Sequence, residues 1–342
     1  MNSSYGLSIL VPTYNRSSQL KKLTTNVLLP IAYKFKNNVE IIIRDNTGEE
    51  RIKNRLNNEI NLPENINYEV NHKNLEYHGN IQKLLELANK SFIWFFGDDD
   101  EYDLQEICNL INLVLNNDKD CDGFLPCFSY RSEPLFNSNE ILGFDLEKIT
   151  LEKLFKKNKS PFALLSSLIF PNKNLKLDKL ELSNAWLHAI IFLKSLNPHT
   201  YLWINKKPCI YYESVSSEGS ELEQRAITLD YYVNSAIELI KCQEKYAKVK
   251  PPSMNSFHKE VVLWMIQHKG RLIYWSFTNR DMLRYALKGI IIAITKFDKK
   301  LLLYSIILLF LPKALIRILY KIKKWLKRKD SNYIRFFKTI NI

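Results

Sequence analysis

The chain has 342 residues, of which 46% are hydrophobic and 12% aromatic, and its formal net charge is +13. This apolar content excludes a disordered chain and is sufficient for one large packed domain with an appendage. The five cysteines are an odd number without a CxxC pair, which argues against a disulfide framework or a zinc cluster and favours a reducing cytosol.

The first 130 residues alternate between short apolar runs and amphipathic stretches. The apolar runs predict buried strands, and Ser17 or Ser18 and Asp103 are predicted N-caps of helices. This alternation predicts an α/β domain with a mainly parallel, Rossmann-like sheet and helices on both faces. The predicted strands cover 7–11, 39–44, 67–70, 92–96 and 123–128. The first predicted helix follows a cap at Ser17 or Ser18, and the others cover 49–58, 79–89 and 104–115.

After residue 129 the pattern is weaker. A strand is predicted over 164–170 and a helix over 180–196. Residues 213–225 are polar and predict a mobile loop, and the chain is expected to be helical from Ala226 onward.

Three polar clusters follow predicted strands, at residues 12–16, 45–48 and 98–100. Ligands of parallel sheets bind beyond the carboxyl ends of the strands, which lie at one edge of the sheet. We therefore expect one pocket to collect all three clusters. The sequence contains no phosphate loop of the GxxxxGK[ST] or GxGxxG type.

The sharpest feature is the acidic run Asp98-Asp99-Asp100, which follows an apolar strand and Gly97. Hard divalent cations such as Mg²⁺ and Mn²⁺ prefer carboxylate ligands, and they need few of them where phosphate and water supply the rest. In an extended chain the first and third side chains point to the same side. We therefore expect Asp98 and Asp100 to hold a divalent cation and Asp99 to face away. A solvated acidic turn is the alternative interpretation.

Four stretches together resemble the family 2 glycosyltransferases. The run ILVPTYNR at 9–16 resembles the opening strand and loop of that family, and DNTG at 45–48 is similar to its second strand end. Residues 74–89 resemble its RNxGxxxxxNxxxxxA stretch, and 92–100 its metal-binding strand. The resemblance covers about residues 6–130 and weakens towards residue 215. It implies an inverting enzyme with a GT-A fold that uses a nucleotide-sugar donor and Mn²⁺ or Mg²⁺.

The resemblance also implies roles for the first two strand ends. Pro12, Thr13 and Tyr14 would line the nucleotide base and ribose, and Arg16 would contact the base edge or a phosphate. Asp45 would accept a hydrogen bond from the base.

The later motifs carry further implied roles. Asn74 and Asn80 would lie near the nucleotide or stabilise the loop. Asp98 and Asp100 would serve the ribose, the diphosphate and the metal, and Asp99 the ribose or neighbouring backbone.

The sequence departs from the family in the second half. The family commonly places an acidic base, often Glu-Asp, at the start of a helix, and the corresponding stretch LSNAWLH at 182–188 lacks that pair. Inversion requires a base that takes the proton of the acceptor hydroxyl. His188 is the nearest titratable candidate, although it could instead ligate the metal or make a structural hydrogen bond. Asp178 and Glu181 remain alternatives for the base.

The positive charge is concentrated at the end of the chain. From residue 281 onward there are 15 Lys and Arg against 3 Asp and Glu. The apolar run 301–311 is too short to span a bilayer alone. Residues 313–329 carry eight basic and no acidic side chains, interleaved with large apolar ones, which is typical of an interfacial helix. We expect this tail to bind an anionic membrane surface and not nucleic acid; a helical subdomain or a dimer interface is the alternative.

These observations predict a cytoplasmic glycosyltransferase, peripheral on the inner face of the cell membrane. It would move a sugar from a nucleotide-sugar donor to a glycan or lipid-linked acceptor in surface polysaccharide biosynthesis. Two alternatives remain: a catalytically degenerate member acting as a membrane-bound binding subunit, and a sugar nucleotidyltransferase, which would require a Gly-rich GxGxR loop. The predicted regions are a GT-A catalytic domain over 1–215, with a nucleotide-binding half (1–130) and an acceptor half (131–215), a loop and helical extension over 216–280, and a basic amphipathic helical tail over 281–342.

Overall fold

The structure is a computed structural model, and the chain forms two compact units. The first unit comprises Met1–Ser220 with Ser235–Lys250, and the second comprises Glu221–Asn234 with Pro251–Ile342. The helix predicted over 49–58, the loop over 213–225 and the basic stretch 313–329 lie outside the described residues. The structure describes residues 4–48, 60–116, 121–130, 147–150, 165–212 without 174, 176 and 198–200, single positions between 235 and 246, and 279–310 without 297 and 298.

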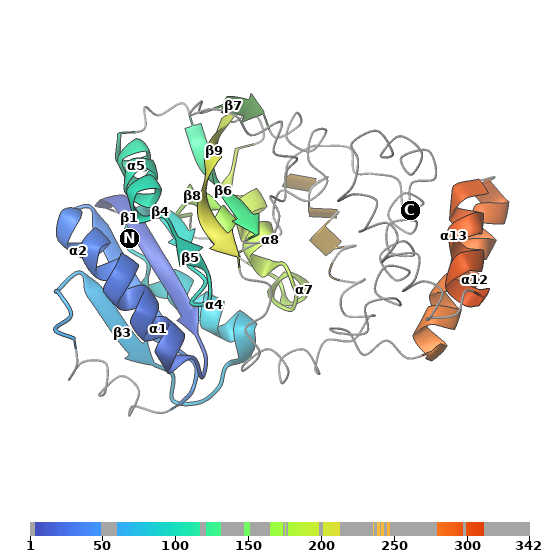
Figure 1. Cartoon of the computed structure of the whole chain (residues 1–342), viewed down its shortest axis with the longest axis horizontal. Coiled ribbons are helices and arrows are strands. Elements are labelled where there is room, and N and C mark those ends of the chain that lie inside the picture. Colours follow the sequence, from blue (N-terminus) through green and yellow to red (C-terminus); the bar gives the residue numbers. More distant parts are fainter. Residues whose placement is uncertain are drawn as a thin grey trace, which may run out of the picture. The chain divides into compact units, whose positions relative to one another are not determined.

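The described part of the first unit is built around a nine-stranded sheet with the order β3-β2-β1-β4-β8-β6-β9-β5, in which β7 also pairs with β9 (Figure 1). Its first four strands in this order are parallel neighbours, because β1 pairs with both β2 and β4, and β2 pairs with β3. The predicted parallel sheet is therefore confirmed. These strands are β1 (Ser4–Thr13), β2 (Val39–Asp45), β3 (Ile66–Val70) and β4 (Lys90–Phe95).

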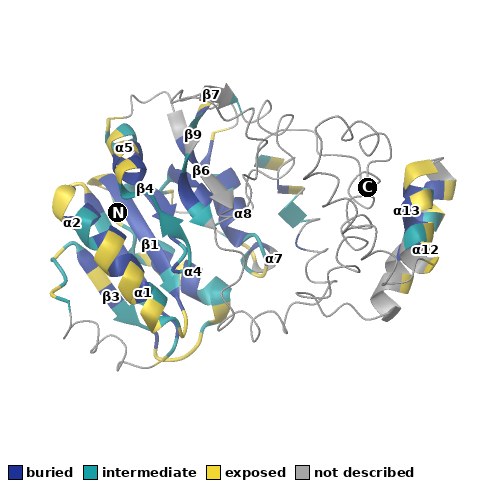
Figure 2. Cartoon of the chain, viewed as in Figure 1, coloured by how far each residue is buried: buried dark blue, intermediate teal, exposed yellow. Residues whose placement is uncertain are grey.

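Helices cover both faces of this sheet, as the alternation predicted. Leu7, Ile9 and Val11 of β1 belong to one buried cluster and Leu10 to a second, so successive side chains enter different cores. Strands that are buried on both faces are continuous apolar runs. Figure 2 shows the buried residues along the strands and the exposed ones on the outer faces of the helices. The first core includes residues of α1 (Ser17–Leu23), α2 (Leu29–Lys34) and α5 (Leu104–Leu115), and the second those of α4 (Glu76–Leu87) and α8 (Leu187–Ser195).

The first helix differs from its prediction at the N-terminus. Ser17 is the first residue of α1, so neither Ser17 nor Ser18 is the N-cap. Arg16 occupies that position and its side chain makes no capping hydrogen bond. The helix then passes through a π-helical turn, η1 (Thr24–Leu28), before α2.

The strand predicted over 164–170 is only partly present. Leu165–Ser167 form a short 3₁₀ helix, η2, and β8 is limited to Ile169–Pro171. The indole Nε1 of Trp94 donates to the carbonyl oxygen of Ser166 at 2.7 Å. The Ser166 carbonyl is therefore bonded by a side chain of β4. The antiparallel pairing of β4 with β8 places η2 beside the end of β4.

The helix predicted over 180–196 is interrupted into α7 (Lys179–Leu182) and α8. Asn184 lies in the break, where its Oδ1 accepts from the Trp186 amide and its Nδ2 donates to the Ser235 carbonyl, each at 2.8 Å. Asparagine side chains that bond to backbone in this way compete with helical hydrogen bonds. The apolar spacing alone could not reveal that competition.

The remaining strands extend the sheet beyond β8. β6 pairs in parallel with β9, while β5 and β7 are antiparallel to β9. Of these strands only β6 was predicted. β9 includes Lys206-Lys207-Pro208, which breaks the apolar pattern, and its pairing with β6 shifts register around Pro208. The bounds are β5 (Glu101–Tyr102), β6 (Cys121–Tyr130), β7 (Glu147–Thr150) and β9 (Tyr201–Tyr212).

The described part of the second unit contains two helices, α12 (Asn279–Lys296) and α13 (Lys299–Phe310), which contact each other. Ala286 and Ala293 of α12 and Leu301 and Tyr304 of α13 are buried. Among the helices that the structure describes, none is both long enough and apolar enough to cross a bilayer.

Asp103 provides a test of local helix stability. The predicted cap is present, because its side chain accepts a hydrogen bond from the Glu106 amide at 3.1 Å. Asp103→Ala should lower the free energy of unfolding by about 1 kcal/mol, measured by urea titration with circular dichroism. Asp103→Asn should retain most of the stability, since asparagine caps helices equally well. Equal losses in both variants would contradict the capping role.

Candidate active site at the carboxyl edge of the sheet

The predicted polar clusters meet at one edge of the sheet. Thr13 at the end of β1 lies opposite Asp45 at the end of β2, which lies opposite Val70 at the end of β3. On the other side of β1, Leu10 pairs with Phe95. The segment after β4 therefore runs beside the end of β1 and the loop that follows it. The parallel register therefore places the three clusters along a single line, as the sequence predicted.

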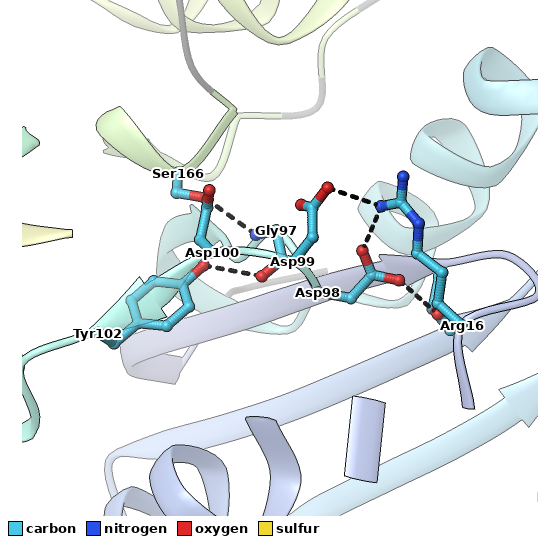
Figure 3. A network of polar contacts seen from close by, with 8 residues as sticks. Arg16, Gly97, Asp98, Asp99, Asp100, Tyr102 and Ser166 are labelled. Atoms are coloured by element: carbon cyan, nitrogen blue, oxygen red, sulfur yellow. Dashed lines mark hydrogen bonds and ion pairs between the residues drawn. The ribbon is translucent and has the colours of Figure 1, made fainter. Parts of the chain in front are cut away.

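An ion-pair network joins the first and third clusters (Figure 3). Arg16 Nη1 lies 2.7 Å from Asp98 Oδ1 and 3.0 Å from Asp99 Oδ2. The Thr13 hydroxyl donates to the other oxygen of Asp98 at 2.7 Å. Both oxygens of Asp98 therefore have a partner from the end of β1 or from the loop that follows it.

The acidic run does not alternate as an extended strand would. β4 ends at Phe95, and residues 98 and 99 form a turn. Asp99 therefore shares Arg16 with Asp98 instead of facing away, and Asp100 is bonded by Ser166. The predicted orientation of Asp99 is wrong because side-chain alternation holds only where the backbone is extended.

Burial governs the electrostatics of these carboxyl groups. It raises the pKa of Asp98, and the Arg16 guanidinium and the Thr13 hydroxyl oppose that rise. Burial raises the pKa of Asp100 to about 7, against hydrogen bonds from Ser166 and Tyr102. A cation beside such a group would favour its ionised form.

The end of β1 and the loop between β1 and α1 carry the remaining predicted residues of the first cluster. Pro12 is half-buried, and Tyr14 is 41% exposed. The backbone turns at Asn15, whose φ of 55° lies in the left-handed region that asparagine adopts more readily than most residues.

The second cluster is held by amide and hydroxyl groups. Asp45 is buried, with Oδ1 accepting from the Thr47 amide at 2.9 Å and Oδ2 from the Tyr68 hydroxyl at 3.0 Å. Asn46 donates to Asn74 Oδ1 at 2.7 Å. These contacts fix the turn that follows β2.

Asn71 connects this turn to α4. Its Nδ2 lies 2.8 Å from Asn46 Oδ1 and 2.9 Å from Asn80 Oδ1. Asn80 Nδ2 in turn donates to the Arg44 carbonyl at 3.1 Å. Both amide ends of Asn80 are thus engaged within the protein, and Asn74 Oδ1 accepts from the Glu76 amide as well. These contacts hold the turn after β2 against α4.

His188 lies in the first turn of α8, and it is buried. Its Nδ1 is 3.2 Å from the hydroxyl oxygen of Tyr77 on α4. A second histidine, His78, has its Nε2 3.2 Å from the Asn184 carbonyl oxygen. Burial lowers the pKa of His78, opposed by the Asn184 hydrogen bond and the charge of Glu76.

Asp178 and Glu181 have structural partners. Each accepts a hydrogen bond from the other's backbone amide at 2.9 Å, which is the reciprocal pattern of a capping box at α7. Glu181 also accepts from Lys194 Nζ at 2.7 Å and from the Tyr246 hydroxyl at 3.1 Å. These contacts account for both carboxylates within the first unit.

The structure adds site residues that sequence reasoning missed. Ser166 and Tyr102 bind the end of the acidic turn, while Tyr68 and Asn71 support the second cluster. Asn71 had a detectable signal, since it follows a predicted strand directly. Ser166 is remote in sequence from the acidic turn and lies in an apolar run. Its polarity was the only signal that could have indicated a role in the site.

The acidic turn suits a cation that shares its coordination sphere with a ligand. Within the described part of the chain, no group of three or more His, Cys, Asp or Glu side chains is arranged to hold a metal ion. Mg²⁺ commonly takes one or two carboxylates and completes its shell with phosphate and water. The Asp99 side chain is 38% exposed, so the turn is accessible. The residues therefore fit a cation bridged to a diphosphate.

The architecture and this acidic edge define a GT-A-like domain. In agreement, the fold is similar to the crystal structure of S. aureus TarS 1-349 in complex with UDP-GlcNAc, with a TM-score of 0.52 and 13% identity over 84% of this chain and 81% of that one. Residues 8–168, slightly less than half of the chain, match the family model described as Glycosyl transferase family 2.

A curated relative is similar in sequence to part of the chain. The abequosyltransferase RfbV of Salmonella typhimurium (strain LT2) is 35% identical over 97 residues. That match spans 28% of this chain and 28% of the relative's own length.

Proposed function

We propose that the protein transfers a sugar, with inversion, from a nucleotide-sugar donor to a glycan or lipid-linked acceptor in surface polysaccharide biosynthesis, with Mn²⁺ or Mg²⁺ as cofactor. The observation that carries this proposal is the acidic turn 98–100, held at the carboxyl edge of a parallel sheet beside Arg16. The match of residues 8–168 to the family 2 glycosyltransferase model supports the reaction class. The chemistry of the relatives named above, a sugar transferase and a protein that binds UDP-GlcNAc, is consistent with it.

The donor nucleotide would occupy the edge formed by β1, β2 and β4. Pro12, Thr13 and Tyr14 would line the base and ribose, with Asp45 accepting from the base. Arg16 forms an ion pair with Asp98, so the donor diphosphate would compete with that carboxylate for the guanidinium. A guanidinium binds phosphate oxygens readily because its donors match their geometry.

Asp100 and Asp98 would hold the divalent cation, and Asp99 would bind the ribose. The cation would neutralise the negative charge that develops on the leaving diphosphate. Asn74 and Asn80 would act on the nucleotide indirectly, by holding the turn that carries Asp45.

His188 would act as the general base. The acceptor oxygen forms a bond to the anomeric carbon as the bond from that carbon to the diphosphate breaks, and the hydroxyl proton passes to the imidazole. Support for this role comes from the position of His188 at the start of α8 and from the structural contacts that occupy Asp178 and Glu181. Tyr77 would orient the ring through Nδ1.

A second candidate function is a catalytically degenerate binding subunit. The burial of His188 and the absence of a Glu-Asp pair favour it. Such a protein would bind the nucleotide sugar at the same edge without transferring it.

The second unit would hold the protein on the anionic inner face of the cell membrane. Leu283, Leu287, Ile291 and Ile294 of α12 are 47% to 63% exposed and recur at helical spacing on one face. Leu303, Ile306 and Phe310 form a similar exposed stripe on α13. The 15 basic residues after residue 280 provide charge complementarity to anionic lipid, at about 1 kcal/mol for each that reaches the surface.

The donor and cation are tested together by a thermal-shift screen of nucleotide sugars with Mn²⁺ or with chelator, because a ligand of the folded state raises the melting temperature. One donor should raise the melting temperature more with Mn²⁺ than with chelator. Asp100→Ala should then lower transfer by at least about 100-fold, since a cation supplies several kcal/mol of charge stabilisation. Glu101→Gln is the matched control, because Glu101 pairs with Lys22 instead. Transfer that persists in chelator or in Asp100→Ala would contradict the metal role.

The base is tested by His188→Ala, which should lower kcat by about 10²- to 10⁴-fold with little change in donor affinity. His78→Ala, on the neighbouring helix, is the control and should leave kcat within a few-fold. A near-normal rate in His188→Ala would exclude His188 as the base. Tight donor binding by the unaltered protein without any transfer would instead identify the binding subunit.

The membrane surface is tested by sedimenting the full chain with vesicles. Binding should be stronger to anionic than to neutral vesicles and should weaken on the order of tenfold in Ile291→Glu, which places a charge in the apolar stripe. Tyr33→Glu, at a 64% exposed site in the first unit, should bind normally. Indifference to lipid charge, or to Ile291→Glu, would contradict the proposal.

A further inference from the structure

Ser166 is the centre of a polar network at the far end of the acidic turn (Figure 3). It is fully buried on η2. Its hydroxyl oxygen accepts from the Gly97 amide at 2.9 Å, and its hydroxyl donates to Asp100 Oδ2. The Tyr102 hydroxyl lies 3.2 Å from the Ser166 hydroxyl and 3.0 Å from the Gly97 carbonyl.

Counting protons fixes the direction of the Ser166 hydroxyl. A serine hydroxyl has one proton and two lone pairs, and an ionised carboxylate can only accept. The Gly97 amide can only donate, so it uses one serine lone pair. Tyr102 has its own proton for the Gly97 carbonyl, the second serine lone pair or Asp100. The Ser166 proton is therefore committed to Asp100 whenever that carboxyl group is ionised.

The surroundings leave little room for another arrangement. A Cβ at Gly97 would lie 2.7 Å from Asp100 Oδ2 and 3.3 Å from the Ser166 hydroxyl oxygen, so the carboxylate packs directly on the backbone there. Tyr102 stacks on Phe96 with 4.4 Å between ring centroids. The Ser166 carbonyl is held by Trp94. Backbone and side chain of Ser166 are thus both anchored to the end of β4.

We propose that Ser166 is the positioning residue of Asp100, which holds one carboxylate oxygen so that the group is preoriented for a divalent cation on the donor diphosphate. This inference rests on the proposed cation role of Asp100. Without the hydroxyl, Asp100 would have to be ordered by the cation itself, at a cost in cation affinity. Binding of the nucleotide base would be unaffected, because its ligands come from the other strand ends.

Calorimetry of nucleoside diphosphate binding, with and without Mn²⁺, measures this effect without requiring transfer. In Ser166→Ala the Mn²⁺ needed for half-maximal binding should rise about 10- to 100-fold, the range for one hydrogen bond to a charged group. Metal-free nucleotide affinity should stay within about twofold on the same argument. Ser166→Cys, nearly isosteric with a weak donor, should be intermediate and guards against a folding defect in the alanine variant.

Ser195→Ala is the matched control, since it removes another fully buried hydroxyl. The Ser195 hydroxyl donates to the backbone carbonyl of Phe192 at 2.7 Å. Saturating Mn²⁺ should restore binding in Ser166→Ala, which a general loss of structure would not allow. An unchanged Mn²⁺ requirement in Ser166→Ala, or an equal change in Ser195→Ala, would overturn the role of Ser166 alone. Absence of Mn²⁺-dependent nucleotide binding in the unaltered protein would overturn the proposed function and this inference together.

Discussion

Three consecutive carboxylates at the end of a buried strand repel one another, and the first of them, Asp98, is only 5% exposed. The pairing of Arg16 with Asp98 and Asp99 offsets this repulsion. Because Arg16 follows β1 and the carboxylates follow β4, the pairing requires these two strands to be parallel neighbours. The fold and the charge pattern are therefore mutually dependent: the sheet brings the ions together, and the ions hold the loops at its edge.

The same turn is held at both ends by different chemistry. Asp98 is bound by a guanidinium and a hydroxyl from the end of β1 and the loop after it, whereas Asp100 is bound by the hydroxyl of Ser166. A diphosphate with its cation would displace the first set of contacts more readily than the second, because a guanidinium can exchange one anion for another. This asymmetry gives the edge one adaptable side and one fixed side, which suits a site that binds and releases a charged donor.

The first half of the chain was predictable because its information is local. Apolar runs defined the strands, and the polar residues at their ends, such as Asp45 and Asp98, had to share an edge once the strands were parallel. Ser166 could not be placed in this way, since its contact with Asp100 depends on the antiparallel pairing of β4 with β8 across more than sixty residues. The break at Asn184 and the strand β9 were missed for similar reasons: tertiary partners overrode the local pattern.

The most direct test of the central claim is a crystal structure of the full chain with Mn²⁺ and a nucleoside diphosphate, using the anomalous signal of manganese. One manganese peak should be coordinated by Asp100 and by diphosphate oxygens, with Ser166 still bonded to the carboxylate and Arg16 turned towards a phosphate. A diphosphate bound away from the carboxyl edge, or manganese located without contact to the acidic turn, would contradict the account.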